Sequence, residues 1–138
     1  MAGLGVVIHD SCGRVIGALA ERIPIPTSPA IVEALTYRRA MVFAEELNLM
    51  DTVFEGDVEQ IIKALQAKEV HHPEYGHVLQ DSLVLASDFW VCSFTHVKCV
   101  SNSIAHFLTR RSKSCNELQV WLDSLPKDLA PLALKDFL

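Results

Sequence analysis

The chain changes directly from a β-type run to a helical pattern at Asp57. The run Met50–Glu55 contains β-branched and aromatic residues, and residues 58–67 then repeat apolar side chains at helical spacing. Open α/β sheets carry their functional groups where strands give way to helices, just beyond the carboxyl ends of the strands. The pattern therefore predicts an α/β fold with the Asp57 carboxylate at a functional edge of the sheet.

The rest of the chain supplies the other elements of such a fold. Gly3–His9 and Val15–Glu21 are β-type runs separated by a glycine-containing turn, which predicts a hairpin. A helix is predicted over Pro29–Asn48, with Thr27 or Ser28 as its N-cap. Further helices are predicted at Val58–Ala67, His77–Ser87 and Asn102–Lys113, and a further strand at Phe89–Val100. This order predicts one mixed-sheet α/β domain with flanking helices.

Composition limits the class of protein. A chain of 138 residues with 50% hydrophobic content is long enough for one domain with a core. It contains no signal-like leader and no apolar run near the ~20 residues of a membrane span, so we expect a soluble intracellular protein. The four cysteines lack zinc spacing. A net charge of −5 disfavours strong nonspecific binding to nucleic acid, although Arg110, Arg111 and Lys113 form a local basic cluster.

Glu33 is the first candidate functional residue. It lies on the alanine-rich face of its predicted helix, with Ala30 and Ala34, and this face should contact the sheet. A charge on a sheet-facing surface is costly. The alternative is a structural acid stabilised by the helix dipole, which contributes ~0.3–1 kcal/mol but does not explain this choice of face. We interpret Glu33 as a functional acid.

Asp57 is the second candidate. Together with Gln60 it matches a capping box, whose loss would cost about 1 kcal/mol, so a purely structural role is the alternative. A strand-end aspartate can also direct a carboxylate oxygen at a metal. Glu55 alternates with Asp57 along the strand and competes with it as the functional acid.

The histidines and the known catalytic motifs add little. His71 and His72 lie in a predicted solvated loop, and His96 is expected to be a hydrogen-bonded structural residue of a strand. The sequence contains no nucleophile elbow, phosphate-binding glycine loop or dinucleotide fingerprint. The two acids therefore remain the main candidates for chemistry.

Five segments together resemble a known family. They are Gly3–Gly17, Val32–Leu35, Phe54–Asp57, Phe94–Lys98 and Val100–Arg110. In this order they resemble the hairpin, helix acid, strand-end aspartate, last strand and C-terminal helix of ribonuclease H-like domains. The resemblance is to the reverse-transcriptase-related type, which is derived from retrotransposons and numerous in plants. It covers Gly3–Arg111, and the order and spacing are more specific than any single motif.

The resemblance implies an endonuclease that hydrolyses the RNA strand of RNA–DNA hybrids. In such enzymes four carboxylates hold two Mg²⁺ ions, with Mn²⁺ as a possible substitute, because these hard cations prefer oxygen ligands. Carried over by position, Glu33 is the helix acid and Asp57 the strand-end acid, and both would be catalytic metal ligands.

The chain departs from the family at the other two acids. The family's first aspartate lies on a central strand before the hairpin, where this chain has only Met1 and Ala2. We therefore expect a ribonuclease H-like mixed sheet that lacks this first strand, in an N-terminally truncated domain over residues 1–113. The fourth acid is replaced by His106, which we expect to hydrogen-bond a phosphate or act on a metal-bound water. With two of four carboxylates, hydrolysis should be weak or absent.

Residues 114–138 are predicted to form an apolar C-terminal tail, in which Trp121–Pro126 docks on a protein partner or on the chain's own sheet. Three functions stay open at this point. The first is a ribonuclease H-like domain that binds RNA–DNA hybrids, and the second a non-catalytic interaction module with the same fold. The third is an ordinary α/β domain in which Glu33 and Asp57 are only cap residues.

Overall fold

The computed structural model describes residues 2–12, 14–24, 28–96, 108 and 118–122. Its chain forms two compact units, one from residues 1–26 with 99–138 and one from residues 27–98. Both antiparallel and parallel strand pairing occur, as predicted for a mixed sheet. None of the helices in the described part is both long and apolar enough to cross a membrane.

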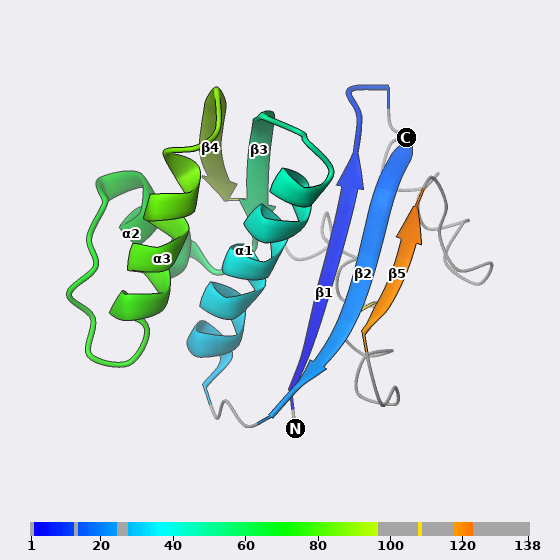
Figure 1. The fold of residues 1–138 in the computed structure, drawn as a ribbon. Coiled ribbons are helices and arrows are strands. Elements are labelled where there is room, and N and C mark those ends of the chain that lie inside the picture. The colour runs from blue at the N-terminus through cyan, green and yellow to red at the C-terminus, as the bar shows by residue number, and fades with distance from the viewer. Residues whose placement is uncertain (1, 13, 25–27, 97–107, 109–117, 123–138) are drawn as a thin grey trace. The chain divides into compact units, whose positions relative to one another are not determined.

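The first unit is built on an antiparallel sheet. β1 (Ala2–His9) and β2 (Val15–Ile23) form the predicted hairpin, with Gly5 opposite Ala20. β5 (Gln119–Leu122) pairs with the other side of β2, far away in sequence (Figure 1). Four residues of the predicted tail therefore join the chain's own sheet. On one face Leu108 packs with two alanines of β2, and Val7 and Trp121 cover the cluster.

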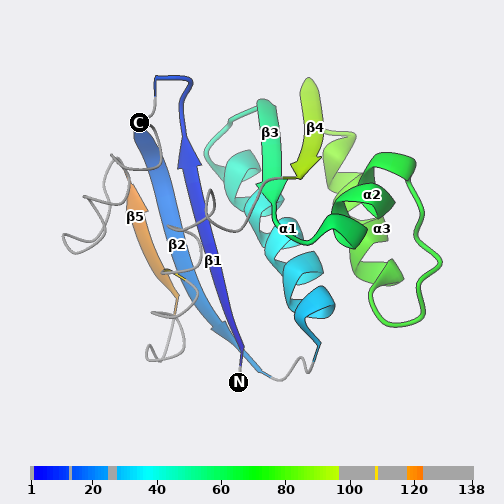
Figure 2. The same ribbon diagram turned by 180° about the vertical axis from the view of Figure 1, so that it is seen from behind.

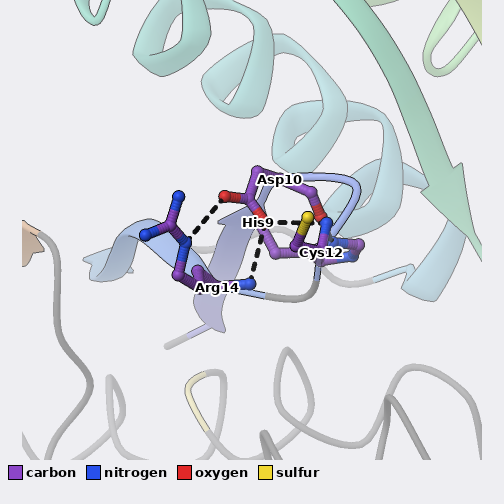
Figure 3. A network of polar contacts seen from close by, with 4 residues as sticks. All are labelled: His9, Asp10, Cys12 and Arg14. Atoms are coloured by element: carbon purple, nitrogen blue, oxygen red, sulfur yellow. Dashed lines mark hydrogen bonds and ion pairs between the residues drawn. The ribbon is translucent and has the colours of Figure 1, made fainter.

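The turn of the hairpin is organised by Asp10 (Figure 3). Its carboxylate accepts hydrogen bonds from the backbone N–H groups of Cys12 and Arg14, both at 2.9 Å. The Arg14 Nε–H donates to the second carboxylate oxygen at 3.2 Å. The Arg14 backbone hydrogen bond is the main reason that the pKa of Asp10 lies below its usual value of 3.8. This local network determines where the chain reverses.

The second unit contains a parallel strand pair and three helices. Its elements are α1 (Pro29–Glu46), β3 (Asp51–Gly56), α2 (Glu59–Ala67), α3 (Gly76–Ala86) and β4 (Val91–His96). β3 and β4 lie side by side in both views, with Phe54 opposite Phe94 (Figure 2). Parallel strands cannot be joined by a tight turn, and α2 and α3 form the connection between them.

An aromatic cluster holds the second unit together. The Phe54 ring lies 5.6 Å from the Phe89 ring in an edge arrangement and 6.0 Å from the Phe94 ring in a stacked one. The helices bury their apolar stripes, as the periodicity predicts. The buried apolar residues are Ala34, Tyr37, Met41, Phe43 and Ala44 of α1, and Ile61, Ile62 and Leu65 of α2.

Several predicted boundaries move by one or two residues. Asn48 has a φ of 58°, and this left-handed conformation ends α1 at Glu46, before the predicted end. β4 begins at Val91, because Phe89 still belongs to the turn that closes α3, where its N–H donates to the carbonyl of Ala86. The helix predicted at 102–113 lies outside the described residues, except for Leu108.

Candidate active site

The second unit brings Glu33 of α1 close to Asp57, the residue that follows β3. Burial raises the pKa of Glu33 from 4.5 to about 7, and the negative charge of Asp57 adds to the effect. A carboxylate whose pKa is raised partly by a second carboxylate lies in the same site as that second group. They lie at the carboxyl end of the parallel pair, which is where open α/β sheets place their functional groups.

Glu33 is held by the way that α1 begins. Ser28 is the N-cap, and its side-chain oxygen accepts a hydrogen bond from the Ala30 N–H at 3.2 Å. The first turn of α1 contains no acid, and Glu33 comes after it. Because dipole effects fall off within the first turn, they stabilise Glu33 little. The half-buried position of Glu33 therefore has a cost that capping and the dipole do not offset.

The structure does not place Asp57 at the N-cap of α2, which the capping-box alternative requires. The N-cap of α2 is Val58, which has no side-chain cap, and α2 begins at Glu59. The Val58 carbonyl accepts from the N–H groups of Ile61 and Ile62 at 3.2 and 3.3 Å, so the helix begins one residue later than the box requires. Asp57 therefore precedes the N-cap position that a capping box requires.

Gly56 provides space for the site. A Cβ atom at this position would lie 2.8 Å from the Glu33 Oε1 atom, and it would also overlap with the Tyr37 hydroxyl. The missing side chain therefore lets Glu33 and Tyr37 approach the end of β3. Tyr37 is only 3% exposed, and its hydroxyl has no hydrogen-bond partner among the described residues. Burial, followed by the nearby charge of Glu33, raises the pKa of Tyr37.

His96 links the ends of the two parallel strands. Its Nε2–H donates to the backbone carbonyl of Asp57 at 3.3 Å, which confirms the predicted hydrogen-bonded structural histidine. Two residues earlier in β4, the carbonyl of Phe94 accepts a hydrogen bond from the side-chain amide of Gln66 at 2.7 Å. These two hydrogen bonds fix the backbone around Asp57 at the ends of β3 and β4.

Comparison with known proteins identifies the family. The sequence profile of the family described as reverse transcriptase-like matches residues 1–112, most of the chain. The chain belongs to this family. No curated protein matches it.

Two solved structures show the fold of this reverse transcriptase-like chain. It is similar to RNase H1 from the halophilic archaeon Halobacterium salinarum, with a TM-score of 0.75 and 20% identity over 80% of this chain and 84% of the other. It is also similar to the N-terminal RNase H domain of a Mycobacterium tuberculosis protein, solved as a fusion with maltose-binding protein. That match has a TM-score of 0.60 and 14% identity over 80% of this chain and 90% of the other. The predicted ribonuclease H-like fold is confirmed.

The other predicted polar residues lie elsewhere or outside the described residues. His106 is among those outside, so its catalytic role stays a prediction. His71 and His72 are exposed in a loop, as predicted. The His72 ring stacks on Tyr75 with a centroid distance of 3.7 Å, and its Nδ1 accepts from the Glu74 N–H. Glu55 is exposed on β3.

The sequence interpretation missed two residues of this reverse transcriptase-like site. Tyr37 was identified only as a sheet-facing residue of α1, and Gly56 only as part of the strand-end motif. A signal for Tyr37 was present, since it follows Glu33 by four residues and so occupies the same helix face. No comparable signal existed for Gly56, because its contacts come from a helix far away in sequence.

The donor set fits one divalent cation. Mg²⁺ is usually bound through one or two carboxylates, with water and phosphate oxygens as the other ligands. Glu33 and Asp57 are such a pair, and a cation between them would offset both the burial and the repulsion by Asp57 that raise the pKa of Glu33. The described residues contain no cluster of three or more metal-ligating side chains. A second cation would need donors from outside the described part of the chain.

Proposed function

We propose that this chain is a ribonuclease H-like domain that binds RNA–DNA hybrids and hydrolyses their RNA strand weakly. The observation that carries the proposal is the Glu33–Asp57 pair at the carboxyl end of β3, within the fold of RNase H. Its motifs resemble those of plant retrotransposon-derived domains, and we assign it to that type and to the inside of the cell as part of the proposal.

We assign a separate role to each residue of the site. Glu33 and Asp57 would hold a divalent cation, Mg²⁺ or Mn²⁺, which supplies Lewis-acid stabilisation of the phosphate and lowers the pKa of a bound water when present. Glu33 must be ionised for this role, and its pKa of about 7 means that it loses its charge below neutral pH. His96 holds the Asp57 backbone in place. We assign to His106 a hydrogen bond to the phosphate.

The rate should be low because the acids proposed for this site are only Glu33 and Asp57, whereas two-metal hydrolysis in this family uses four. Each tenfold loss of rate corresponds to about 1.4 kcal/mol of barrier. Weak cleavage is therefore the expected behaviour of the full chain, and a sensitive assay is needed to detect it.

The test is cleavage of an end-labelled RNA–DNA hybrid in the presence of Mg²⁺ or Mn²⁺. The purified chain is compared with its Glu33→Gln and Asp57→Asn variants, which preserve side-chain size and remove the charge. We expect slow cleavage by the unaltered chain and a further loss of roughly 10²- to 10³-fold in each variant. Equal cleavage by all three proteins would refute the assignment of the acids and point to a contaminating nuclease.

A second candidate is a binding module without catalysis. It is favoured by exposed aliphatic residues in the predicted tail, namely Val120 and Leu122 of β5 and Leu118 just before it. Exposed apolar rows on a sheet are typical of surfaces that contact a partner. Hybrid binding that weakens with salt, with no cleavage by any of the proteins, would favour this candidate over the hydrolase.

A further inference from the structure

The buried hydroxyl of Tyr37 makes no hydrogen bond to any residue that the structure describes. The ring is accounted for, because it packs edge-on against Phe94 at a centroid distance of 6.1 Å and is almost completely buried. A phenylalanine would make the same contacts. The hydroxyl adds only a polar group without a partner among the described residues, and such a group destabilises the fold. Its presence therefore calls for an explanation outside the packing of the core.

The structure makes room for this hydroxyl beside the acid pair. The Tyr37 hydroxyl and the Glu33 Oε1 atom both occupy the space that a side chain at position 56 would fill. Gly56 is buried and directly precedes Asp57. A glycine at the end of β3 thus admits a hydroxyl and a carboxylate to the same small space, next to the second carboxylate.

The chemistry of a ligating carboxylate indicates what the hydroxyl does. A carboxylate that binds a cation through one oxygen keeps further lone pairs, and these are normally occupied by outer hydrogen-bond donors that fix its orientation. A phenol O–H is a suitable donor. Among the described residues no other side chain donates a hydrogen bond to Glu33, whereas the Tyr37 hydroxyl lies beside it and is unpaired.

We propose that Tyr37 is a positioning residue of the site, whose hydroxyl donates a hydrogen bond to the Glu33 carboxylate when Glu33 holds a divalent cation. Gly56 is the residue that gives this hydroxyl access. The inference rests on the proposed function in one respect, namely that Glu33 binds a cation. It goes further by assigning a role to a residue that carries no charge and contacts no substrate.

The test measures cation binding without nucleic acid, through the electron paramagnetic resonance signal of free Mn²⁺ at about pH 8, where Glu33 is ionised. The full chain is compared with Tyr37→Phe and with Tyr75→Phe, a matched change of a buried tyrosine outside the site. We expect about 10- to 100-fold weaker binding for Tyr37→Phe, the usual effect of removing an outer donor, and unchanged binding for Tyr75→Phe.

Two further measurements separate positioning from a general structural effect. The melting temperature of metal-free Tyr37→Phe should equal or exceed that of the unaltered chain, because the substitution removes an unsatisfied buried group. In a Glu33→Gln background, Tyr37→Phe should cause no further loss of Mn²⁺ binding, because the hydroxyl acts through the carboxylate.

The possible failures are distinguishable. If the unaltered chain binds Mn²⁺ and Tyr37→Phe binds it equally well, the role of Tyr37 is refuted while the proposed function stands. If Tyr37→Phe binds weakly but also melts at a lower temperature, the residue is structural and the inference fails. If the unaltered chain binds no Mn²⁺, the proposed function fails, and the inference fails with it.

Discussion

Asp10 and Glu33 are the same kind of group in opposite circumstances. Asp10 is in the hairpin turn of the first unit and receives hydrogen bonds from Cys12 and Arg14, which lower its pKa (Figure 3). Glu33 is half-buried in the second unit beside another acid, and its pKa is raised to about 7. The first carboxylate is stabilised by its environment and shapes the chain locally. The second is retained at a cost in stability, which is typical of functional sites.

The largest expected effect is on catalysis. Glu33→Gln should reduce hybrid cleavage by roughly 10²- to 10³-fold, the usual loss on removing one group that stabilises developing charge. Asp10→Asn makes the matched change in the other carboxylate and should leave the rate unaltered. Both rates are measured with labelled hybrid and Mg²⁺. Equal losses in the two variants would mean that the two acids do not differ as we infer.

The next effect is the pH dependence of stability. Because the pKa of Glu33 is raised in the folded state, Glu33 lowers the free energy of unfolding progressively as pH rises from 4.5 to about 7. Its effect is constant above that pH. The penalty is at most about 3–4 kcal/mol, at ~1.4 kcal/mol per pKa unit. Glu33→Gln should therefore gain free energy of unfolding relative to the unaltered chain at pH 8, and not at pH 4.5. Urea unfolding at both pH values measures this, and a parallel pH profile for the two proteins would contradict it.

A smaller effect is expected from filling the space at Gly56. Gly56→Ala should lower the free energy of unfolding by about 1–3 kcal/mol, because the new methyl group overlaps with Tyr37 and Glu33. In a Tyr37→Leu background, which removes the hydroxyl and ring edge, the same substitution should cost less. Urea unfolding of the four proteins in this cycle gives the coupling between the two positions. Strict additivity would show that the two side chains do not compete for this space.

The smallest effect concerns the hairpin turn. Asp10→Ala should lower the melting temperature slightly at neutral pH, because the turn loses its side-chain acceptor. Since the pKa of Asp10 is lowered in the folded state, its contribution is present above its usual pKa of 3.8 and is lost as pH falls below that value. The difference in melting temperature between the two proteins should therefore disappear in strong acid. If the difference in melting temperature persists in strong acid, it arises from the backbone preferences of Asp and Ala and not from the charge of Asp10.

Much of the fold was predictable because its signals are local. The hairpin is predicted by two β-type runs around a turn, and the start of α1 is predicted by Ser28 and Pro29. Both predictions are confirmed. The pairing of Glu33 with Asp57 was also predictable, as a consequence of a sheet-facing helix acid and a strand-end acid. The role of these acids remains a proposal, as does the division into a domain over 1–113 and a tail.

The failures have a common physical origin. The capping-box alternative misplaced the start of α2, because a short motif cannot show which residue begins the helix when the strand runs on to Gly56. Docking of the tail on the chain's own sheet is confirmed for Gln119–Leu122, but the strand pairing of β5 with β2 was not predicted. It joins segments about a hundred residues apart, with Ala18 opposite Trp121. Such pairings depend on edges and surfaces that local propensities do not encode.

The sequence by itself determined which segments are helices and strands, and in which order they come. It also determined that one acid, Glu33, lies on the sheet-facing side of a helix and another, Asp57, at the end of a strand. Periodicity and turn chemistry act over a few residues, so they can be read along the chain. Only the tertiary structure decided that the Asp10 carboxylate is stabilised by hydrogen bonds, whereas the Glu33 carboxylate is destabilised by burial beside Asp57. It also decided that Gly56 leaves room for the Tyr37 hydroxyl. These properties depend on burial and on distances between elements, which exist only once α1 and the end of β3 have come together.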